Sequence, residues 1–97
     1  MDINYTLRMI GLARKANNIR YGDENTSLAV RDGRASLIIL SADAAENTKK
    51  RVLKLSEESK VPILEIPATK AELGRAIGKE TCAVLAVCNR GIANAIQ

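Results

Sequence analysis

Two uninterrupted apolar runs constrain the fold of this chain more than any other feature. The first is ASLIILSA, residues 35–42, and the second is TCAVLAVC, residues 81–88. Both have the length of a strand. Neither shows the alternation of apolar and polar residues that is typical of a strand with one solvent-exposed face. Such strands must be covered on both sides. We therefore expect Leu37–Leu40 and Val84–Val87 to be inner strands of a sheet between two helical layers.

The remaining segments alternate between helical and strand patterns. Ile3, Leu7 and Ile10 recur at helical spacing, which predicts an amphipathic first helix. The predicted helices cover residues 3–16, 22–32, 43–60, 69–78 and 91–97, and two minor strands cover 19–21 and 61–66. Strands that alternate with helices indicate an α/β protein, a three-layer α/β/α sandwich with a small mixed sheet.

Capping signals mark several of the predicted helix ends. Asp43 is followed three residues later by Glu46, and Thr69 by Glu72, and both pairs have the spacing of an N-terminal capping box. Gly33 is predicted to end the second helix, because glycine readily adopts the left-handed conformation found there.

Length and composition fit one small domain, residues 1–97, with an aliphatic core. The 97 residues are 46% hydrophobic and 27% charged, and two tyrosines are the only aromatic residues. Aromatic platforms for stacking bases are therefore largely absent. The net charge is +4, and all but four of the 15 basic residues lie in the first 60 positions. This balance favours an anionic partner.

The sequence disfavours catalysis and metal binding. It has no histidine and no CxxC pair, so we expect no metal site, no cofactor and no catalytic residue. Cys82 and Cys88 lie in an apolar run and are expected to be reduced core residues of a cytoplasmic protein without leader or membrane segment. The stretch GRAIGKET superficially suggests a phosphate loop, but three residues separate its glycines where a phosphate loop has four, and glutamate follows its lysine. Gly74 and Gly78 are better interpreted as a close-packing glycine and a helix-ending glycine.

The stretch YGDEN, residues 21–25, has two interpretations. Asp, Asn, Ser and Thr at a helix start satisfy free N–H groups, and early carboxylates suit the helix dipole. Alternatively, an exposed helix start that carries donors and acceptors side by side can read base edges of a nucleic acid. The basic cluster Lys49, Lys50, Arg51 and Lys54 also has two interpretations. It is either an ordinary solvated helix face or a set of phosphate contacts.

Four stretches together resemble the bacterial YlxQ-type proteins, relatives of the archaeal kink-turn-binding ribosomal protein. They are GLARKANNIRYGDEN, ASLIILSADAAENTKKR, VPILEI and TKAELGRAIGKE, and the similarity runs from about residue 7 to 95. The resemblance implies a non-catalytic α/β/α protein that binds kink-turns, which are RNA helices sharply bent at an asymmetric bulge beside sheared G·A pairs. A-form RNA hides its major groove unless the helix is distorted in this way.

The resemblance also implies which residues contact RNA. In the archaeal relative a Gly-x-Asn-Glu-x-x-Lys pattern begins the second helix, and a loop after the third long strand covers the extruded nucleotide. Here Gly22 matches the glycine, Glu24 and Asn25 occupy the next positions in reversed order, and Leu28 replaces the lysine. The expected RNA-binding residues are Lys15, Asn18, Arg20, Gly22, Asp23, Glu24, Asn25, Leu28, Arg31, Ile66, Pro67, Ala68 and Thr69. Lys49, Lys50, Lys54 and Lys70 are expected to contact phosphates.

Two functions remain open at this stage. The first is an RNA-binding protein of the ribosome or translation apparatus, expected to act as a monomer, and the net charge favours it. The second is an interaction protein that keeps the fold but has weakened or lost kink-turn binding, and Leu28 favours it because a leucine replaces the expected cation.

Overall fold

The computed structural model describes all residues, 1–97, and contains nine helices and strands. In chain order they are α1 (Ile3–Lys15), β1 (Ile19–Tyr21), α2 (Asp23–Arg31), β2 (Leu37–Ser41), α3 (Glu46–Ser59), β3 (Ile63–Ile66), α4 (Lys70–Ala76), β4 (Val84–Val87) and α5 (Arg90–Ile96). Every predicted element is present, although most are one to three residues shorter at one or both ends.

The four strands form one mixed sheet in the order β1-β4-β2-β3. β4 pairs antiparallel with both β1 and β2, whereas β2 pairs parallel with β3. The two apolar runs therefore supply the two inner strands, as predicted. Pro62 precedes the edge strand β3, where its missing N–H costs no ladder hydrogen bond, and its carbonyl accepts from Ile38 at 2.9 Å.

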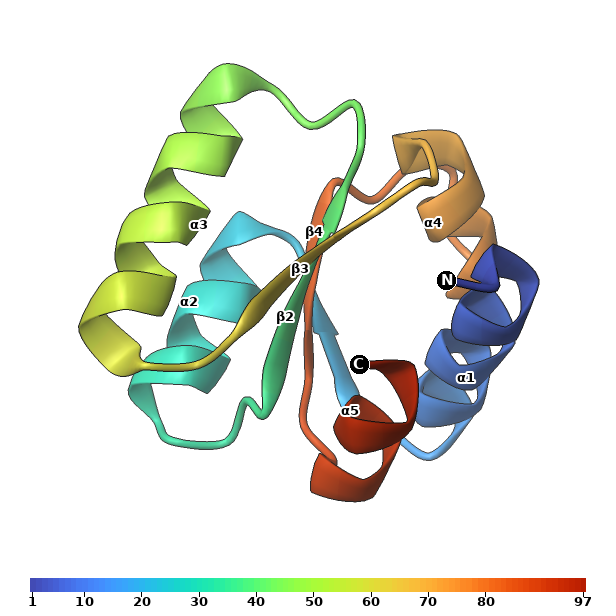
Figure 1. Cartoon of the computed structure of the whole chain (residues 1–97), viewed down its shortest axis with the longest axis horizontal. Helices are drawn as coiled ribbons and strands as arrows, with labels where there is room; N and C mark the ends of the chain where they lie inside the picture. The colour runs from blue at the N-terminus through green and yellow to red at the C-terminus, as the bar shows by residue number, and fades with distance from the viewer.

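Helices cover both faces of the sheet, which confirms the three-layer sandwich. α2 and α3 lie on one side, and α1, α4 and α5 on the other (Figure 1). Successive residues of β2 point to opposite layers: Leu37 and Ile39 join the cluster with α1, α4 and α5, whereas Ile38 and Leu40 join the cluster with α2 and α3. The uninterrupted apolar sequence of β2 is thus explained by two separate hydrophobic cores, one on each face.

Some helix ends follow the predictions and one does not. Thr69 and Glu72 form both hydrogen bonds of a capping box at the start of α4. Gly33 and Gly78 have φ angles of +74° and +77°, which are left-handed values that favour glycine. The capping box predicted at Asp43 is wrong, because α3 begins at Glu46 without a side-chain cap. The chain turns away between these two residues, and the Asp43 carboxylate accepts instead from the backbone N–H of Lys70.

The two cysteines lie just outside β4, and only one is a core residue. Cys82 is buried, whereas Cys88 is half-buried. Both are free thiols, and burial raises the pKa of each. Because the raised pKa keeps them protonated at neutral pH, neither is a ready thiolate nucleophile.

Gly74 packs α4 against the strand connection that follows it. A Cβ atom placed there would lie only 2.7 Å from the backbone N and Cα of Thr81, a distance that Cβ contacts essentially never show. Gly74 is therefore a close-packing glycine, as the sequence suggests, and not part of a phosphate loop.

We expect Gly74→Ala to lower the free energy of unfolding by about 1–3 kcal/mol, because the added methyl group must displace backbone atoms. An exposed helical glycine would instead gain up to about 1 kcal/mol from the same change. Urea unfolding gives the sign directly. A stabilised Gly74→Ala variant would contradict the close approach of α4 to Thr81.

Candidate nucleic-acid interface

Backbone hydrogen bonds bring several loops together at one edge of the sheet. The N–H of Gly22, just before α2, donates to the carbonyl of Val84 at 2.9 Å. In the β2–α3 loop, the N–H of Ala42 donates to the carbonyl of Ala68 in the β3–α4 loop, also at 2.9 Å. These two loops meet at the top of the view in Figure 1. The start of α2 and the β3–α4 loop, which sequence similarity links to one RNA site, therefore belong to the same edge.

The start of α2 is uncapped and exposed. Gly22 is the N-cap with φ +90°, and no side chain accepts from the first N–H groups of the helix. The side-chain capping interpretation of YGDEN is therefore wrong, while Asp23 and Glu24 still lie where carboxylates suit the helix dipole. The side chains of Asp23, Glu24 and Asn25 are all exposed. This helix start offers unoccupied backbone donors beside side-chain acceptors.

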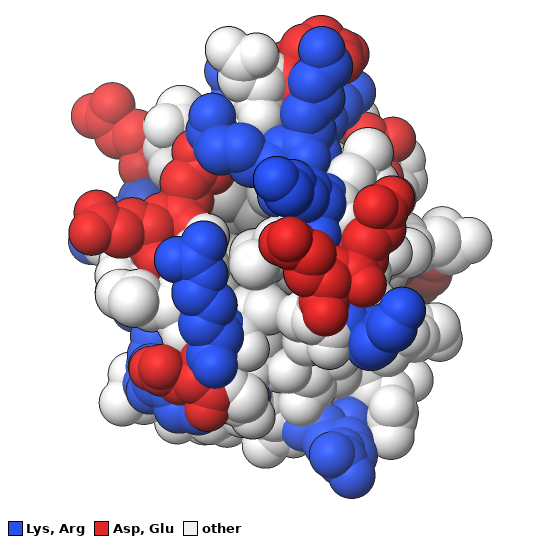
Figure 2. Space-filling view, turned by 90° about the vertical axis from the view of Figure 1, so that its left-hand side faces the viewer, with Lys and Arg blue, Asp and Glu red and all other residues white.

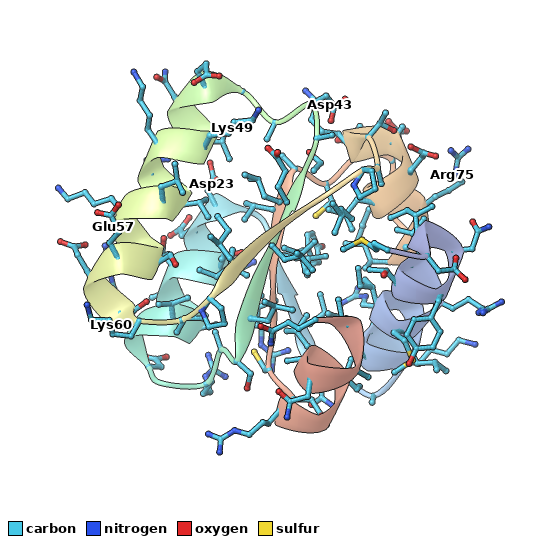
Figure 3. The ribbon with its side chains drawn as sticks, viewed as in Figure 1. Asp23, Asp43, Lys49, Glu57, Lys60 and Arg75 are labelled. Atoms are coloured by element: carbon cyan, nitrogen blue, oxygen red, sulfur yellow. The ribbon has the colours of Figure 1, made fainter.

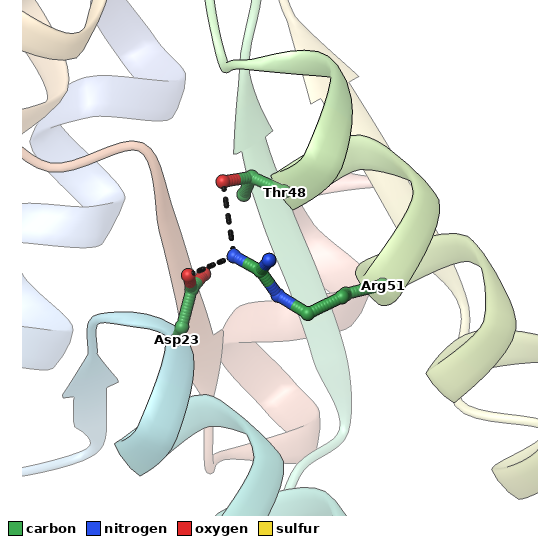
Figure 4. Close-up of polar contacts among 3 residues, drawn as sticks. All are labelled: Asp23, Thr48 and Arg51. Carbon is green, nitrogen blue, oxygen red and sulfur yellow. Dashed lines mark hydrogen bonds and ion pairs between the residues drawn. The ribbon is translucent and has the colours of Figure 1, made fainter.

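Asp23 is held by an interaction that the sequence does not reveal. The Arg51 guanidinium on α3 donates to the Asp23 carboxylate and, at 3.4 Å, to the hydroxyl of Thr48 (Figure 4). Both members of the ion pair are about half exposed, so the pair contributes little stability, about 0–1 kcal/mol. It does fix the start of α2 against α3. The partners are 28 positions apart, and no local pattern predicts them.

Glu24 and Asn25 remain available for a ligand. Glu24 makes no ion pair, and the Asn25 amide nitrogen donates to the carbonyl of Tyr21 at 3.1 Å. This hydrogen bond orients the Asn25 side chain and leaves its amide oxygen as a free acceptor. Farther along α2, Leu28 and Arg31 are exposed as well, and 48% of Leu28 is accessible. Leu28 is therefore a surface residue.

Only part of the β3–α4 loop presents its side chains to solvent. Ile66 and Ala68 are 1% and 2% exposed and belong to the core, whereas Pro67 and Thr69 are exposed. The Thr69 hydroxyl accepts from the N–H of Glu72, so it caps α4. If a ligand lies on this loop, side-chain contacts can come from Pro67 and Thr69, and Ile66 and Ala68 support the loop from beneath.

Asp43 ties the β2–α3 loop to the start of α4, and Figure 3 shows it at that edge. Its carboxylate accepts from the backbone N–H of Lys70 at 2.8 Å. Partial desolvation raises the pKa of Asp43, but this hydrogen bond, the nearby Ser41 hydroxyl and the backbone N–H of Asp43, together with the Lys70 charge, outweigh it and hold the pKa below its ordinary value. The bond joins residues 27 positions apart and steadies both loops at the edge.

The predicted phosphate-contacting lysines are not equivalent. Lys49 is half-buried and forms an ion pair with Glu65 at 3.4 Å, whereas Lys50 and Lys54 are exposed and unpaired. Lys70 is half-buried at the start of α4. The face over α3 mixes Lys and Arg with Asp and Glu (Figure 2). It is therefore not a uniformly basic surface. Of the lysines predicted to contact phosphates, Lys50 and Lys54 are the ones that are both exposed and unpaired.

The upstream residues of the predicted site differ in availability. Lys15 is exposed, and Asn18 is half-buried, with its carbonyl accepting from the N–H of Cys88. Arg20 donates through one guanidinium nitrogen to the carbonyls of Asn17 and Ile19, so that nitrogen is committed to the turn before β1. The ring of Tyr21 contacts two cations, Arg14 and Lys79. The sequence does not predict these contacts, because both partners are distant from Tyr21 in the chain.

Two further observations concern other kinds of site. No group of three or more His, Cys, Asp and Glu side chains is placed to hold a metal ion. None of the five helices has the length and apolar character needed to cross a membrane.

The fold and this exposed sheet edge together define a small α/β domain, and comparison with known proteins identifies its family. The family model described as ribosomal protein L7Ae/L30e/S12e/Gadd45 matches residues 6–96. This chain belongs to that family. The resemblance to the YlxQ-type proteins is likewise confirmed.

Individual relatives cover most of the chain. The "RNA-binding protein YlxQ" of Bacillus subtilis (strain 168) is 38% identical over 86 residues, which are 89% of this chain and 85% of the relative. The "large ribosomal subunit protein eL30" of Methanosarcina mazei is 33% identical over 94% of this chain and 84% of its own. A solved structure from Bacillus halodurans C, of a protein with unknown function, is 34% identical, with a TM-score of 0.88 and coverage of 94% and 91%.

The hydrogen bond of Asp43 makes stability depend on pH. Folding lowers the pKa of Asp43 below 3.8, so its carboxylate stabilises the fold above that pH, and the benefit is lost as the pH falls through the lowered pKa. We expect Asp43→Asn to unfold at lower urea than the parent at about pH 7, with a smaller difference at about pH 3. Glu57→Gln, at an exposed and unpaired position, is the control. An equal deficit of Asp43→Asn at both pH values would contradict this role.

Proposed function

We propose that this protein is a non-catalytic RNA-binding protein of the ribosome or translation apparatus that recognises kink-turn or similarly bent RNA. The relatives called RNA-binding protein YlxQ and ribosomal protein eL30 support this class of function. The observation that carries the proposal is the position of the α2 start and the β3–α4 loop at the same sheet edge. We expect the protein to act as a single domain and a monomer in the cytoplasm.

The exposed groups of this edge suit a distorted RNA helix. A bend widens the major groove, and sheared G·A pairs leave guanine amino and imino groups free to donate hydrogen bonds to a carboxylate. Glu24 and the free amide oxygen of Asn25 are such acceptors. The uncapped N–H groups that follow Gly22 can bind a phosphate at the positive end of the helix dipole. Lys50, Lys54 and Arg31 add long-range attraction for the backbone.

A protein partner is the second candidate function, and one observation favours it. Leu28 on α2 and Leu53 on α3 are 48% and 49% exposed, where an RNA-facing surface gains more from cations. Single exposed leucines are common on protein surfaces, however, and the face over α3 is rich in charged side chains (Figure 2). RNA therefore remains the function that the geometry supports best.

The first test is a titration against a kink-turn RNA and a matched straight duplex. We expect the parent to prefer the kink-turn and Glu24→Ala and Asn25→Ala to lose about 1–3 kcal/mol of that preference each, because base contacts carry the discrimination. Lys50→Gln with Lys54→Gln should instead weaken both RNAs to a similar degree, since phosphates carry no sequence information. Full discrimination in both alanine variants would refute the proposed reading role of α2.

Leu28→Lys tests the departure from the family pattern. The added ammonium group restores the expected cation, so we expect kink-turn binding to tighten by about 1 kcal/mol or more. Stability should stay within about 0.5 kcal/mol, because the site is exposed and leucine and lysine have nearly equal helix propensity. Isothermal titration and urea unfolding provide the two measurements. Unchanged stability with unchanged RNA affinity would favour the protein-partner function.

A further inference from the structure

The α1–α4 seam, where these two helices pack side by side, is a second feature with the character of a binding surface. A Cβ atom on Gly11 of α1 would lie 3.2 Å from the carbonyl oxygen of Ala76 in α4, so the two backbones nearly touch there. A groove of about 510 Å³ opens along the contact. Arg8 and Arg75 line it from opposite helices, and Figure 3 shows Arg75 projecting outward from α4 on the α1 side.

The cations of the seam form no ion pairs within the protein. The molecule has three ion pairs, Arg34 with Asp32, Lys49 with Glu65 and Arg51 with Asp23, and all lie outside the seam. Glu72 is the one acidic residue that lines the groove, and its carboxylate already accepts from the N–H of Thr69 in the capping box of α4. Arg8 and Arg75 are thus unpaired within the protein, and their guanidinium groups can contact a ligand.

Two more cations converge at the far end of the seam. The Arg14 guanidinium lies 5.3 Å from the centre of the Tyr21 ring, and the Lys79 ammonium lies 5.2 Å from the same point. The two charges are thus separated by no more than about one Debye length at 0.1 M salt, and they repel each other. The ring attracts both cations, and an anion close to either of them would offset the repulsion.

The position and composition of the seam favour RNA phosphates over an acidic protein. Tyr21 packs against the hydrophobic cluster with α1 and α4 and directly precedes Gly22 in the chain, so a single residue links the seam to the start of α2. Protein interfaces usually need a buried apolar centre, whereas four of the seven residues that line the groove are polar or charged and its Leu7 is already half-buried. Cations spaced along an open groove match a phosphate backbone better.

We propose that the α1–α4 seam is a second RNA-binding surface, on which Arg8, Arg14, Arg75 and Lys79 contact the phosphate backbone of an RNA segment leading away from the α2 start. The proposal rests on the proposed RNA-binding function and extends the footprint to the layer of helices opposite α2 and α3. Contacts of this kind add affinity and salt dependence without sequence preference.

The test compares two double variants with equal loss of charge. Arg8→Gln with Arg75→Gln removes the groove cations, and Arg90→Gln with Lys60→Gln removes two exposed, unpaired cations elsewhere on the molecule. Both are titrated with a kink-turn RNA whose stems are long enough to reach the seam, over a range of salt concentrations. Thermal unfolding first checks that both variants remain folded.

We expect the seam variant to bind at least about fivefold more weakly at low salt, with a log–log salt slope shallower by about one per lost phosphate contact. The control should change affinity less than twofold. As a second measurement, the Arg Nε resonances of Arg8 and Arg75 should shift when RNA is added to the parent. Equal losses in the two variants, or unmoved Arg8 and Arg75 resonances, would overturn the proposal.

The same experiment separates this proposal from the proposed function. If the parent binds kinked and straight RNA equally well, kink-turn recognition fails, and a seam-specific loss would still support the second surface. If the parent binds neither RNA but binds polyglutamate in a manner that depends on Arg8 and Arg75, the seam serves an acidic protein partner and the RNA proposal is overturned.

Discussion

Burial of β2 and β4 on both faces is the constraint on which the rest of this structure depends. All four residues of β4 and all five of β2 are buried, so each strand needs a helical layer on either side. The two hydrophobic clusters take alternate residues of the same strand, as Leu37 and Ile38 illustrate. The five helices provide these two layers. The sheet is thereby fixed in position, and the loops at its edge project from a rigid base.

That rigid base allows an exposed site to be held mainly by backbone hydrogen bonds. The bond between Gly22 and Val84 positions the start of α2, and the bond between Ala42 and Ala68 positions the β3–α4 loop. Asp43 adds a side-chain bond across the same edge. Because these contacts use main-chain atoms or a single carboxylate, the exposed side chains of Glu24 and Asn25 are free to vary with the ligand.

Charge is distributed unevenly over the two helical layers. On the α2–α3 layer cations are interleaved with carboxylates, and Arg51 and Lys49 are paired. Along the α1–α4 seam the cations Arg8 and Arg75 have no acidic partner, and the Tyr21 ring gathers two more. A net charge of +4 therefore understates the local positive field near the seam. In the proposed complex, the RNA contacts both layers, with specificity assigned to the α2 start and added affinity to the seam.

The sequence by itself determined the elements, the sandwich and the family, because hydrophobic period, capping signals and glycine positions act over a few residues. It identified Gly74 as a packing glycine and the two inner strands. It misplaced the role of Asp43, since the carboxylate's partner lies 27 positions away and only folding brings them together. The tertiary structure alone decided which site residues are accessible: Ile66 and Ala68 face the core, and Asp23 is paired with Arg51. It alone placed Tyr21 beneath Arg14 and Lys79. Local patterns record which residues favour a helix or strand, whereas burial and pairing depend on segments that meet only in the folded chain.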